Sequence, residues 1–119
     1  MKLNRLHNTN NPSQGPSPKV LCVCSAGLLR SPTASVVINR EYGHNTRSAG
    51  LSEDFALIVV DDVLLAWADV VVCMTGMQEA ELKGRITDGT PVQCLHIRDA
   101  YAYMDPELQD LILQKYLPL

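Results

Sequence analysis

The chain alternates short apolar runs with longer stretches in which apolar residues recur at helical spacing. The runs predict strands and the stretches predict helices. The expected order is strand 19–24, helix from about 32 to 42, strand 45–49, helix from about 53 to 67, strand 69–74, a short helix, strand 92–97 and a final helix. Such alternation is typical of a parallel sheet with helices on both faces. The pattern therefore predicts an α/β fold with three layers.

Local signals refine the first two helices. Gly43 is placed to end the first helix, and His44 just beyond it is expected to be exposed. Ser52 is predicted to cap the second helix. The apolar stripe predicted for that helix consists of Phe55, Val59, Val63 and Trp67. We expect Trp67 to lie in the core.

The later strands carry signals of a different kind. The run Asp69 to Met74 predicts a central buried strand, and Thr75-Gly76-Met77-Gln78 has the capping-box pattern of a helix start. Val92 to Ile97 predicts another apolar strand, with Cys94 and His96 on the same side. A structural role for this histidine is the expected one.

Composition sets limits on size and partners. A length of 119 residues with 46% hydrophobic content suits one domain, predicted at 19–119. Residues 1–18, rich in Asn, Pro, Ser and Gly, predict a flexible N-terminal tail. The net charge of −3 and the absence of any Lys/Arg run argue against nucleic-acid and membrane-surface partners. No stretch is long enough to span a membrane.

The four cysteines indicate the cellular compartment in which the protein is expected. Cys22, Cys24, Cys73 and Cys94 lie in apolar, strand-like runs, and no signal peptide precedes them. We expect them to be reduced, in an intracellular and cytoplasmic protein. Cys73 is expected to be inert packing.

The strongest chemical signal is a cysteine followed, after five residues, by Arg30-Ser31-Pro32. Cys24 ends a predicted strand and Pro32 is expected to open a helix. The residues between Cys24 and Arg30 are Ser25, Ala26, Gly27, Leu28 and Leu29. A loop of this length can wrap one tetrahedral anion with its backbone N–H groups, with the helix dipole behind them. The pattern predicts a phosphate-binding loop with a nucleophile at its floor.

Each residue type suits a separate task in such a loop. A cysteine at a helix N-terminus near an arginine ionises readily, so Cys24 is predicted to be a thiolate. Arg30 offers a planar fork that matches two phosphoryl oxygens. Ser31 can donate a hydrogen bond to the thiolate or cap the helix, and Gly27 permits a left-handed backbone. The alternative is a buried, inert Cys24 and a surface Arg30, which the combined strand, loop and helix signals disfavour.

A cysteine phosphatase also needs an acid for the leaving oxygen, and two aspartates compete for this role. Asp99 follows the last strand at the carboxyl edge of the sheet, where ligands bind in open α/β folds. Asp105 precedes Pro106 and an apolar helical pattern, which is typical of a helix N-cap. A capping aspartate stays ionised because it accepts backbone N–H bonds. We therefore favour Asp99 as the acid.

Taken together, these motifs resemble the low-molecular-weight protein tyrosine phosphatase family. Val20 to Ser35 is similar to its active-site loop, Arg47-Ser48-Ala49-Gly50 to its second strand, Trp67 to Thr75 to its third, and Asp99-Ala100-Tyr101 to its Asp-Pro-Tyr. The resemblance covers about residues 19 to 119.

That resemblance implies a four-stranded parallel sheet and hydrolysis of phosphotyrosine or another aryl phosphate through a phosphocysteine, with no metal or other cofactor. Its implied partner is a phosphorylated protein or a small aryl phosphate. Cys24 is then the nucleophile, Arg30 the phosphate binder, Ser31 the thiolate partner and Asp99 the acid. Tyr101 would form part of the pocket wall, with Tyr103 a weaker candidate.

The loop departs from the family pattern at several points. Ala26-Gly27 stands where the family usually has Gly-Asn, so the bracing asparagine is missing. Leu29 replaces a second cysteine found in many members, and Cys22 is a poor substitute because a bond to Cys24 would be strained. Ala100 replaces the proline after the acid. These changes predict a shallower pocket and a different substrate.

Three alternatives stay open on the sequence. The Cys-Ser-Ala-Gly run also resembles the phosphocysteine loop of sugar-transport phosphocarrier domains, although Arg30 argues against a carrier. Arsenate reductases share the scaffold and loop, but their relay needs further cysteines close together, and Cys73 and Cys94 lie on separate predicted strands. A catalytically silent phosphate-binding domain is the third.

Overall fold

The computed structural model describes residues 17–25, 30–54, 56 and 58–118. The elements are β1 (Lys19–Cys24), α2 (Arg30–Tyr42), β2 (Asn45–Gly50), α3 (Asp62–Trp67), β3 (Val70–Cys73), α4 (Gly76–Arg85), β4 (Val92–Cys94) and α5 (Pro106–Lys115). Of the predicted tail, residues 1–16 lie outside the described part of the chain.

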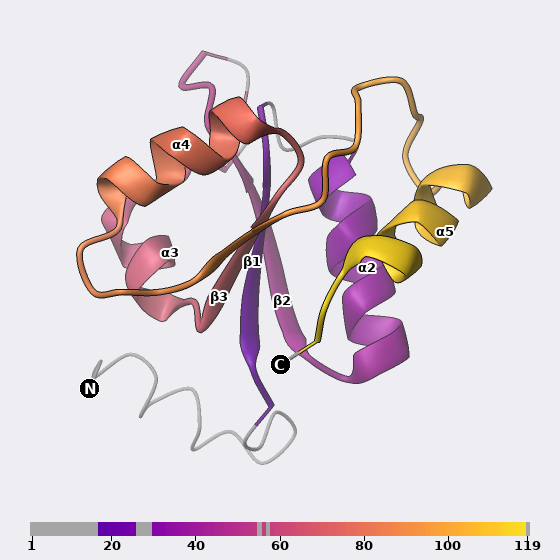
Figure 1. Ribbon diagram of the computed structural model, residues 1–119, viewed down its shortest axis with the longest axis horizontal. Coiled ribbons are helices and arrows are strands. Elements are labelled where there is room, and N and C mark those ends of the chain that lie inside the picture. Colours follow the sequence, from indigo (N-terminus) through magenta and orange to yellow (C-terminus); the bar gives the residue numbers. More distant parts are fainter. Residues whose placement is uncertain (1–16, 26–29, 55, 57, 119) are drawn as a thin grey trace.

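The strands form one parallel sheet of four strands in the order β2-β1-β3-β4. β1 is therefore central, and its residues are all buried. Figure 1 shows the strands crossing the middle of the molecule with helices on both sides. The predicted α/β architecture, a three-layer sandwich with a four-stranded parallel sheet, is confirmed.

Each face of the sheet has its own core. The first, here called the α2/α5 core, packs Cys22, Cys24 and Met74 of the sheet with apolar residues of α2 and α5. The second, the α3/α4 core, packs Val23 and Cys73 with residues of α3 and α4. Alternate residues of one strand thus face opposite layers. Cys24 and Cys73 accordingly lie on opposite faces of the sheet.

Helix α2 begins earlier than predicted. Pro32 was expected to open the helix, but the first helical residue is Arg30. Proline is compatible with this place because the first N–H groups of a helix have no intrahelical partner. The consequence is functional, since the arginine belongs to the first helical turn and not to the loop.

The end of α2 confirms one prediction and corrects another. Gly43 follows the helix with φ of 68°, a conformation that glycine adopts readily, and its N–H bonds to Asn39 O at 2.9 Å. His44 was expected to be exposed, but it is only 7% exposed. Its Nδ1 lies 3.0 Å from Tyr116 Oη, because the segment after α5 covers it. Tertiary packing therefore buries a residue whose position just beyond a helix end predicted exposure.

The second predicted helix is mostly wrong. Among the described residues of this stretch only Asp62–Trp67 is helical. The cap is not Ser52 but Asp61, whose carboxylate accepts from Leu64 N at 2.8 Å. Val59 instead bridges to Gly50 beside β2, and Val63 is 61% exposed. Phe55 lies outside the described residues. Trp67 is buried as predicted, and Arg47 of β2 stacks over its ring at 4.4 Å.

The last strand is shorter than predicted. β4 ends at Cys94, and His96 has φ of 54°, which is incompatible with continued strand geometry. The chain still follows the sheet, since Leu95 N bonds to Cys73 O and Ile97 N to Met74 O. The caps predicted for the last two helices are confirmed: Thr75 and Gln78 form a capping box on α4, and Asp105 caps α5.

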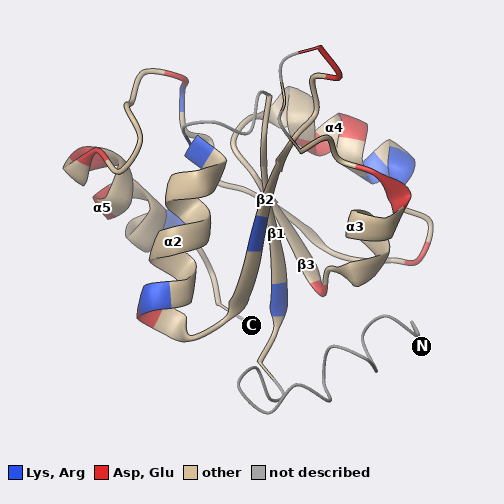
Figure 2. Cartoon of the chain, turned by 180° about the vertical axis from the view of Figure 1, so that it is seen from behind, with Lys and Arg blue, Asp and Glu red and all other residues tan. Residues whose placement is uncertain are grey.

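No helix within the described residues is long and apolar enough to cross a membrane. Figure 2 shows Lys and Arg residues spread over α2, the sheet and α4, with Asp and Glu interspersed among the described elements.

Candidate active site

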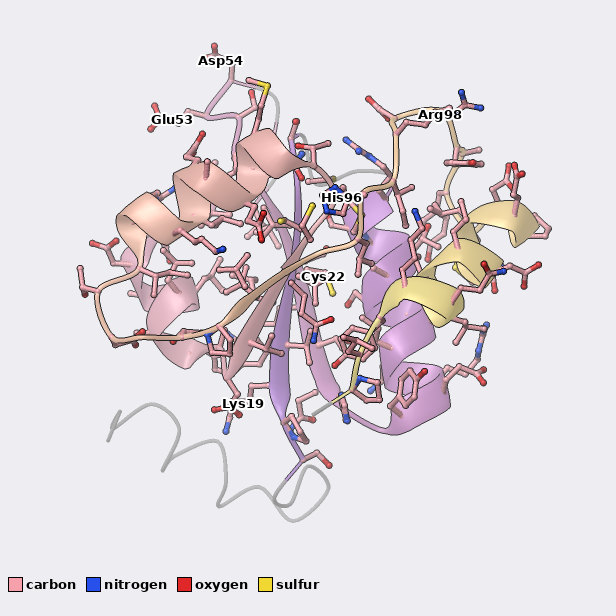
Figure 3. The ribbon with its side chains drawn as sticks, viewed as in Figure 1. Lys19, Cys22, Glu53, Asp54, His96 and Arg98 are labelled. Atoms are coloured by element: carbon pink, nitrogen blue, oxygen red, sulfur yellow. The ribbon has the colours of Figure 1, made fainter. Side chains whose placement is uncertain are left out.

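The predicted nucleophile and its neighbours meet at the carboxyl edge of the sheet. Cys24 ends β1, and the residues after β2, β3 and β4 come to the same edge because the strands are parallel. Figure 3 shows Glu53 and Asp54 on the loop after β2 and Arg98 on the segment after β4, with Lys19 at the opposite end of the sheet. The site is thus built from segments far apart in the sequence.

The Cys24 thiol is buried beside a hydroxyl. It is 4% exposed, and its Sγ lies 3.2 Å from Ser31 Oγ. Ser31 is fully buried in the first turn of α2, and its hydroxyl reaches Ala49 O at 3.5 Å. When Cys24 is ionised, the same hydroxyl can turn and donate to the thiolate. Both predicted partners are therefore in contact.

Arg30 is held inside the protein at the same edge. Its side chain is 4% exposed, and Nη1 donates to Ile97 O at 2.7 Å. Nε lies 3.7 Å from Asp99 Oδ1, whose side chain is 70% exposed. A guanidinium has five N–H donors, so a bond to Ile97 leaves several to face an anion. The arginine is fixed in place rather than loose on the surface.

The loop itself is described at its two ends. Ser25 O accepts from Ser52 N at 2.7 Å, and Cys24 O accepts from Leu51 N at 3.1 Å. The segment after β2 therefore holds the start of the loop. The predicted anion-binding residues Ala26, Gly27, Leu28 and Leu29 lie outside the described residues.

The two aspartates occupy different environments. Asp99 is close to Arg30, as stated above, while the Asp105 carboxylate accepts from Glu107 N at 2.9 Å as the cap of α5. The neighbouring Met104 N bonds to Thr33 Oγ1, which ties this turn to α2. The sequence preference for Asp99 agrees with this geometry, because its carboxylate lies beside Arg30 whereas that of Asp105 serves as a helix cap.

The tyrosines after the candidate acid differ from one another. Tyr101 is partly buried and packs against the α2/α5 core, whereas Tyr103 is 53% exposed. The role of Tyr101 in a pocket wall stays a prediction.

A hollow of 490 Å³ borders the start of the loop. Its lining includes Ser25, Leu51, Met77 and Glu81. Met77 is 87% exposed, so an apolar side chain stands open at the rim. The hollow is large enough to receive an organic group attached to a phosphate held in the loop.

The other cysteines are not equivalent to Cys24. Burial raises the pKa of the Cys22 thiol far above its usual range, with the nearby Cys24 adding to the effect. Burial, followed by the neighbouring Cys94, raises the pKa of Cys73 to about 12. Cys94 is half-buried, with its Sγ 3.5 Å from His96 Nδ1. Cys22 and Cys73 are thus held as neutral thiols, in agreement with the packing role predicted for Cys73.

Sequence reasoning missed two contributors. One is the carbonyl of Ile97, which no side-chain pattern could reveal. The other is Gln78, recognised as half of a capping box, whose Nε2 also donates to Ser25 Oγ at 3.1 Å. The signal available in the sequence was the capping box alone, which says nothing about a loop 53 residues earlier.

Comparison with known proteins gives the fold a context. No protein-family description matches the chain, and no curated protein matches it in sequence. Solved structures do match. The tyrosine phosphatase Wzb from Escherichia coli K30, in complex with phosphate, aligns with a TM-score of 0.62 and 18% identity, covering 83% of this chain and 93% of that chain.

Two further structures have different stated activities. The YwlE arginine phosphatase from Geobacillus stearothermophilus aligns with a TM-score of 0.60 and 17% identity, covering 82% of this chain and 89% of that one. A thioredoxin-dependent arsenate reductase from Corynebacterium glutamicum aligns with a TM-score of 0.59 and 17% identity, covering 94% of this chain and 66% of that one. The chain therefore has the fold that its resemblance to low-molecular-weight phosphatases predicts, and at this identity the likeness speaks for the fold alone.

Proposed function

We propose that the chain is a cysteine-dependent phosphatase that hydrolyses phosphotyrosine or another aryl phosphate monoester. One observation carries the proposal: the Cys24 thiol lies 3.2 Å from the Ser31 hydroxyl at the carboxyl edge where Arg30 is also fixed. This combines a nucleophile, a partner for its thiolate and a cation for the phosphoryl group. The likeness of the fold to a tyrosine phosphatase adds support.

The reaction has two steps. The Cys24 thiolate attacks phosphorus, so that an S–P bond forms while the P–O bond to the leaving group breaks, and Asp99 gives its proton to the leaving oxygen. The Asp99 carboxylate then takes a proton from a water molecule, whose oxygen attacks phosphorus. The S–P bond breaks, inorganic phosphate leaves and the thiolate is restored. Arg30 stabilises the charge on the phosphoryl oxygens in both steps.

The activity is tested with p-nitrophenyl phosphate and purified protein, without added metal and with inorganic phosphate as competitor. We expect release of nitrophenol by the unaltered chain and none by Cys24→Ser. No release by the unaltered chain, with phosphate still bound, would favour a carrier or a silent binding domain instead.

The substrate class needs its own comparison, because one structural neighbour is an arginine phosphatase. Peptides that carry phosphotyrosine, phosphoserine or phosphoarginine should be offered at equal concentration. We expect phosphotyrosine to be hydrolysed fastest, since the hollow beside Ser25 includes the apolar Leu51 and Met77. Faster hydrolysis of phosphoarginine would overturn the assignment of phosphotyrosine as the preferred substrate. It would leave the proposed cysteine chemistry intact.

Arsenate reduction is less well supported. Cys73 and Cys94 lie on separate strands, as predicted, but these strands are neighbours and the two residues are paired in register. The pair therefore lies closer together than its sequence separation suggests. Both thiols belong to the α3/α4 side, however, while Cys24 belongs to the α2/α5 core. A thiol relay between them would have to cross the sheet.

A further inference from the structure

The Gln78 side chain joins α4 to the residue that directly follows the nucleophile. It is 5% exposed, and both ends of its amide are engaged. Oε1 accepts from Met74 N at 2.8 Å and from Thr75 N at 3.2 Å, while Nε2 donates to Ser25 Oγ at 3.1 Å. One buried amide therefore connects the end of β3, the start of α4 and the start of the cysteine loop.

The orientation of this amide follows from its surroundings. Two backbone N–H groups, from Met74 and Thr75, face one end of it, so that end must be the oxygen. The nitrogen is then directed at Ser25, and the hydroxyl oxygen of that serine accepts the bond. The serine hydroxyl consequently donates its own hydrogen away from Gln78.

Helix capping explains only half of these contacts. A capping box needs an acceptor at the third helical position, which glutamate supplies as well as glutamine. The bond to Ser25 needs a donor, which a carboxylate lacks. A carboxylate would also place a negative charge beside a loop predicted to bind an anion. The amide meets the requirements of both the helix and the loop.

Ser25 is thereby held from two directions. Its carbonyl accepts from Ser52 N in the segment after β2, and its hydroxyl accepts from Gln78 in α4. The adjoining Cys24 is fixed by β1 and by Ser31. Hydrogen bonds thus restrain the backbone and side chains at Cys24 and Ser25, where β1 ends and the loop begins.

We propose that Gln78 is a positioning residue that sets the start of the cysteine loop through Ser25. This inference rests on the proposed phosphatase function. The loop sequence lacks an asparagine to brace it, and the bracing amide comes from α4 instead. In general, a loop that binds an anion through its N–H groups needs a fixed starting point, since a small displacement weakens every such bond.

The test is a double-mutant cycle of Gln78→Ala and Ser25→Ala, measured well below the melting temperature of each variant. Either single variant removes the Gln78–Ser25 hydrogen bond, and its loss corresponds to about a three- to tenfold loss in kcat/KM. If Gln78 acts through Ser25, the double variant should lose about as much as either single variant. Losses that multiply would overturn the proposal, because independent effects are additive in free energy.

A matched control separates positioning from stability. Asp61→Ala removes the N-cap of α3, with a loss of stability of about 1 kcal/mol. We expect its melting temperature to fall while its kcat/KM and phosphate affinity stay unchanged. An equal activity loss in this control would mean that destabilisation alone accounts for Gln78→Ala.

A second readout does not depend on turnover. Phosphate protection of Cys24 from alkylation by iodoacetamide is followed by mass spectrometry of its peptide, because Cys94 is half-buried and can also react. We expect Gln78→Ala to need about three to ten times more phosphate for the same protection. Equal protection would overturn the positioning role even if the enzyme is active. Protection without turnover in the unaltered chain would overturn the proposed function and leave the positioning role standing, while absence of protection there would overturn both.

Discussion

The two ends of the parallel sheet both bury polar side chains, but their surroundings differ. At the carboxyl edge Arg30 donates to Ile97 O, and Gln78 donates to Ser25 beside a hollow of 490 Å³. At the amino edge His44 and Tyr116 bond to each other, and the rings of both pack against the ring of Tyr42. At the first end Arg30 keeps further N–H donors that a ligand can accept from, whereas at the second end His44 and Tyr116 satisfy each other. We therefore expect substitutions at the first end to affect activity and at the second to affect stability.

The largest effect is expected at the nucleophile. Cys24→Ser should abolish hydrolysis of p-nitrophenyl phosphate, because a serine hydroxyl without an adjacent base is a far weaker nucleophile than a thiolate. Phosphate binding and the melting temperature should remain close to those of the unaltered chain. Nitrophenol release and calorimetry with added phosphate measure the two properties, and retained turnover would contradict the assignment.

The next effect concerns the acid. Asp99→Asn should lower kcat about 100- to 10,000-fold, the usual contribution of a general acid. Asp105→Asn is the matched control, since asparagine caps a helix about as well as aspartate, and it should keep both activity and stability. Steady-state kinetics decide between them. A greater loss at Asp105 would move the acid to the start of α5.

Stability should respond at the amino edge. Tyr116→Phe leaves His44 Nδ1 without its partner in a buried position, at a cost of about 1–3 kcal/mol in the free energy of unfolding. Catalysis should not change, because this pair lies at the other end of the sheet. Urea unfolding measures stability and kcat/KM of the same preparation measures catalysis. A changed kcat/KM with unchanged stability would contradict the assignment of activity to the carboxyl edge and stability to the amino edge.

Lowering the pH is expected to have a smaller effect on stability. Burial lowers the pKa of His44 below its ordinary value, so the folded state disfavours the proton more than the unfolded state does. The stability that this histidine contributes is complete above about pH 6.5 and is lost as pH falls through the lower folded-state pKa. The melting temperature should therefore fall between pH 7 and pH 5, and less so in His44→Phe.

The control for this pH dependence is His96→Asn, on the exposed segment after β4. Asparagine tolerates the positive φ of 54° at this position, so the substitution removes a histidine without adding backbone strain. If both histidine variants keep the full dependence, other groups must be responsible for it.

The sequence predicted those parts of the molecule that local patterns determine. β1 is a continuous apolar run, and the caps at Thr75 and Asp105 follow from residues three or fewer positions apart. Cys24, Ser31 and Arg30 could be proposed as one site because one loop and one helix turn contain them all. The contact of Arg30 with Asp99 also agrees with the predicted site.

What escaped prediction depends on distant packing. The stripe from Val59 to Trp67 has helical spacing, yet Val59 bridges to β2 because that edge offers backbone partners. His44 is buried by a tyrosine 72 positions later, and Gln78 reaches a serine 53 positions earlier. Neither contact is reflected in the residues adjacent in the sequence, so local sequence patterns could not predict it.

The chain contains one tryptophan, and its place in the fold makes it a built-in optical probe. Trp67 is 4% exposed at the end of α3, shortly before β3, with the Arg47 guanidinium over its ring. Its fluorescence should therefore shift to longer wavelength when the α3/α4 core opens, and should barely respond to phosphate. Unfolding of every variant described above can thus be followed without a label, and separately from occupancy of the site.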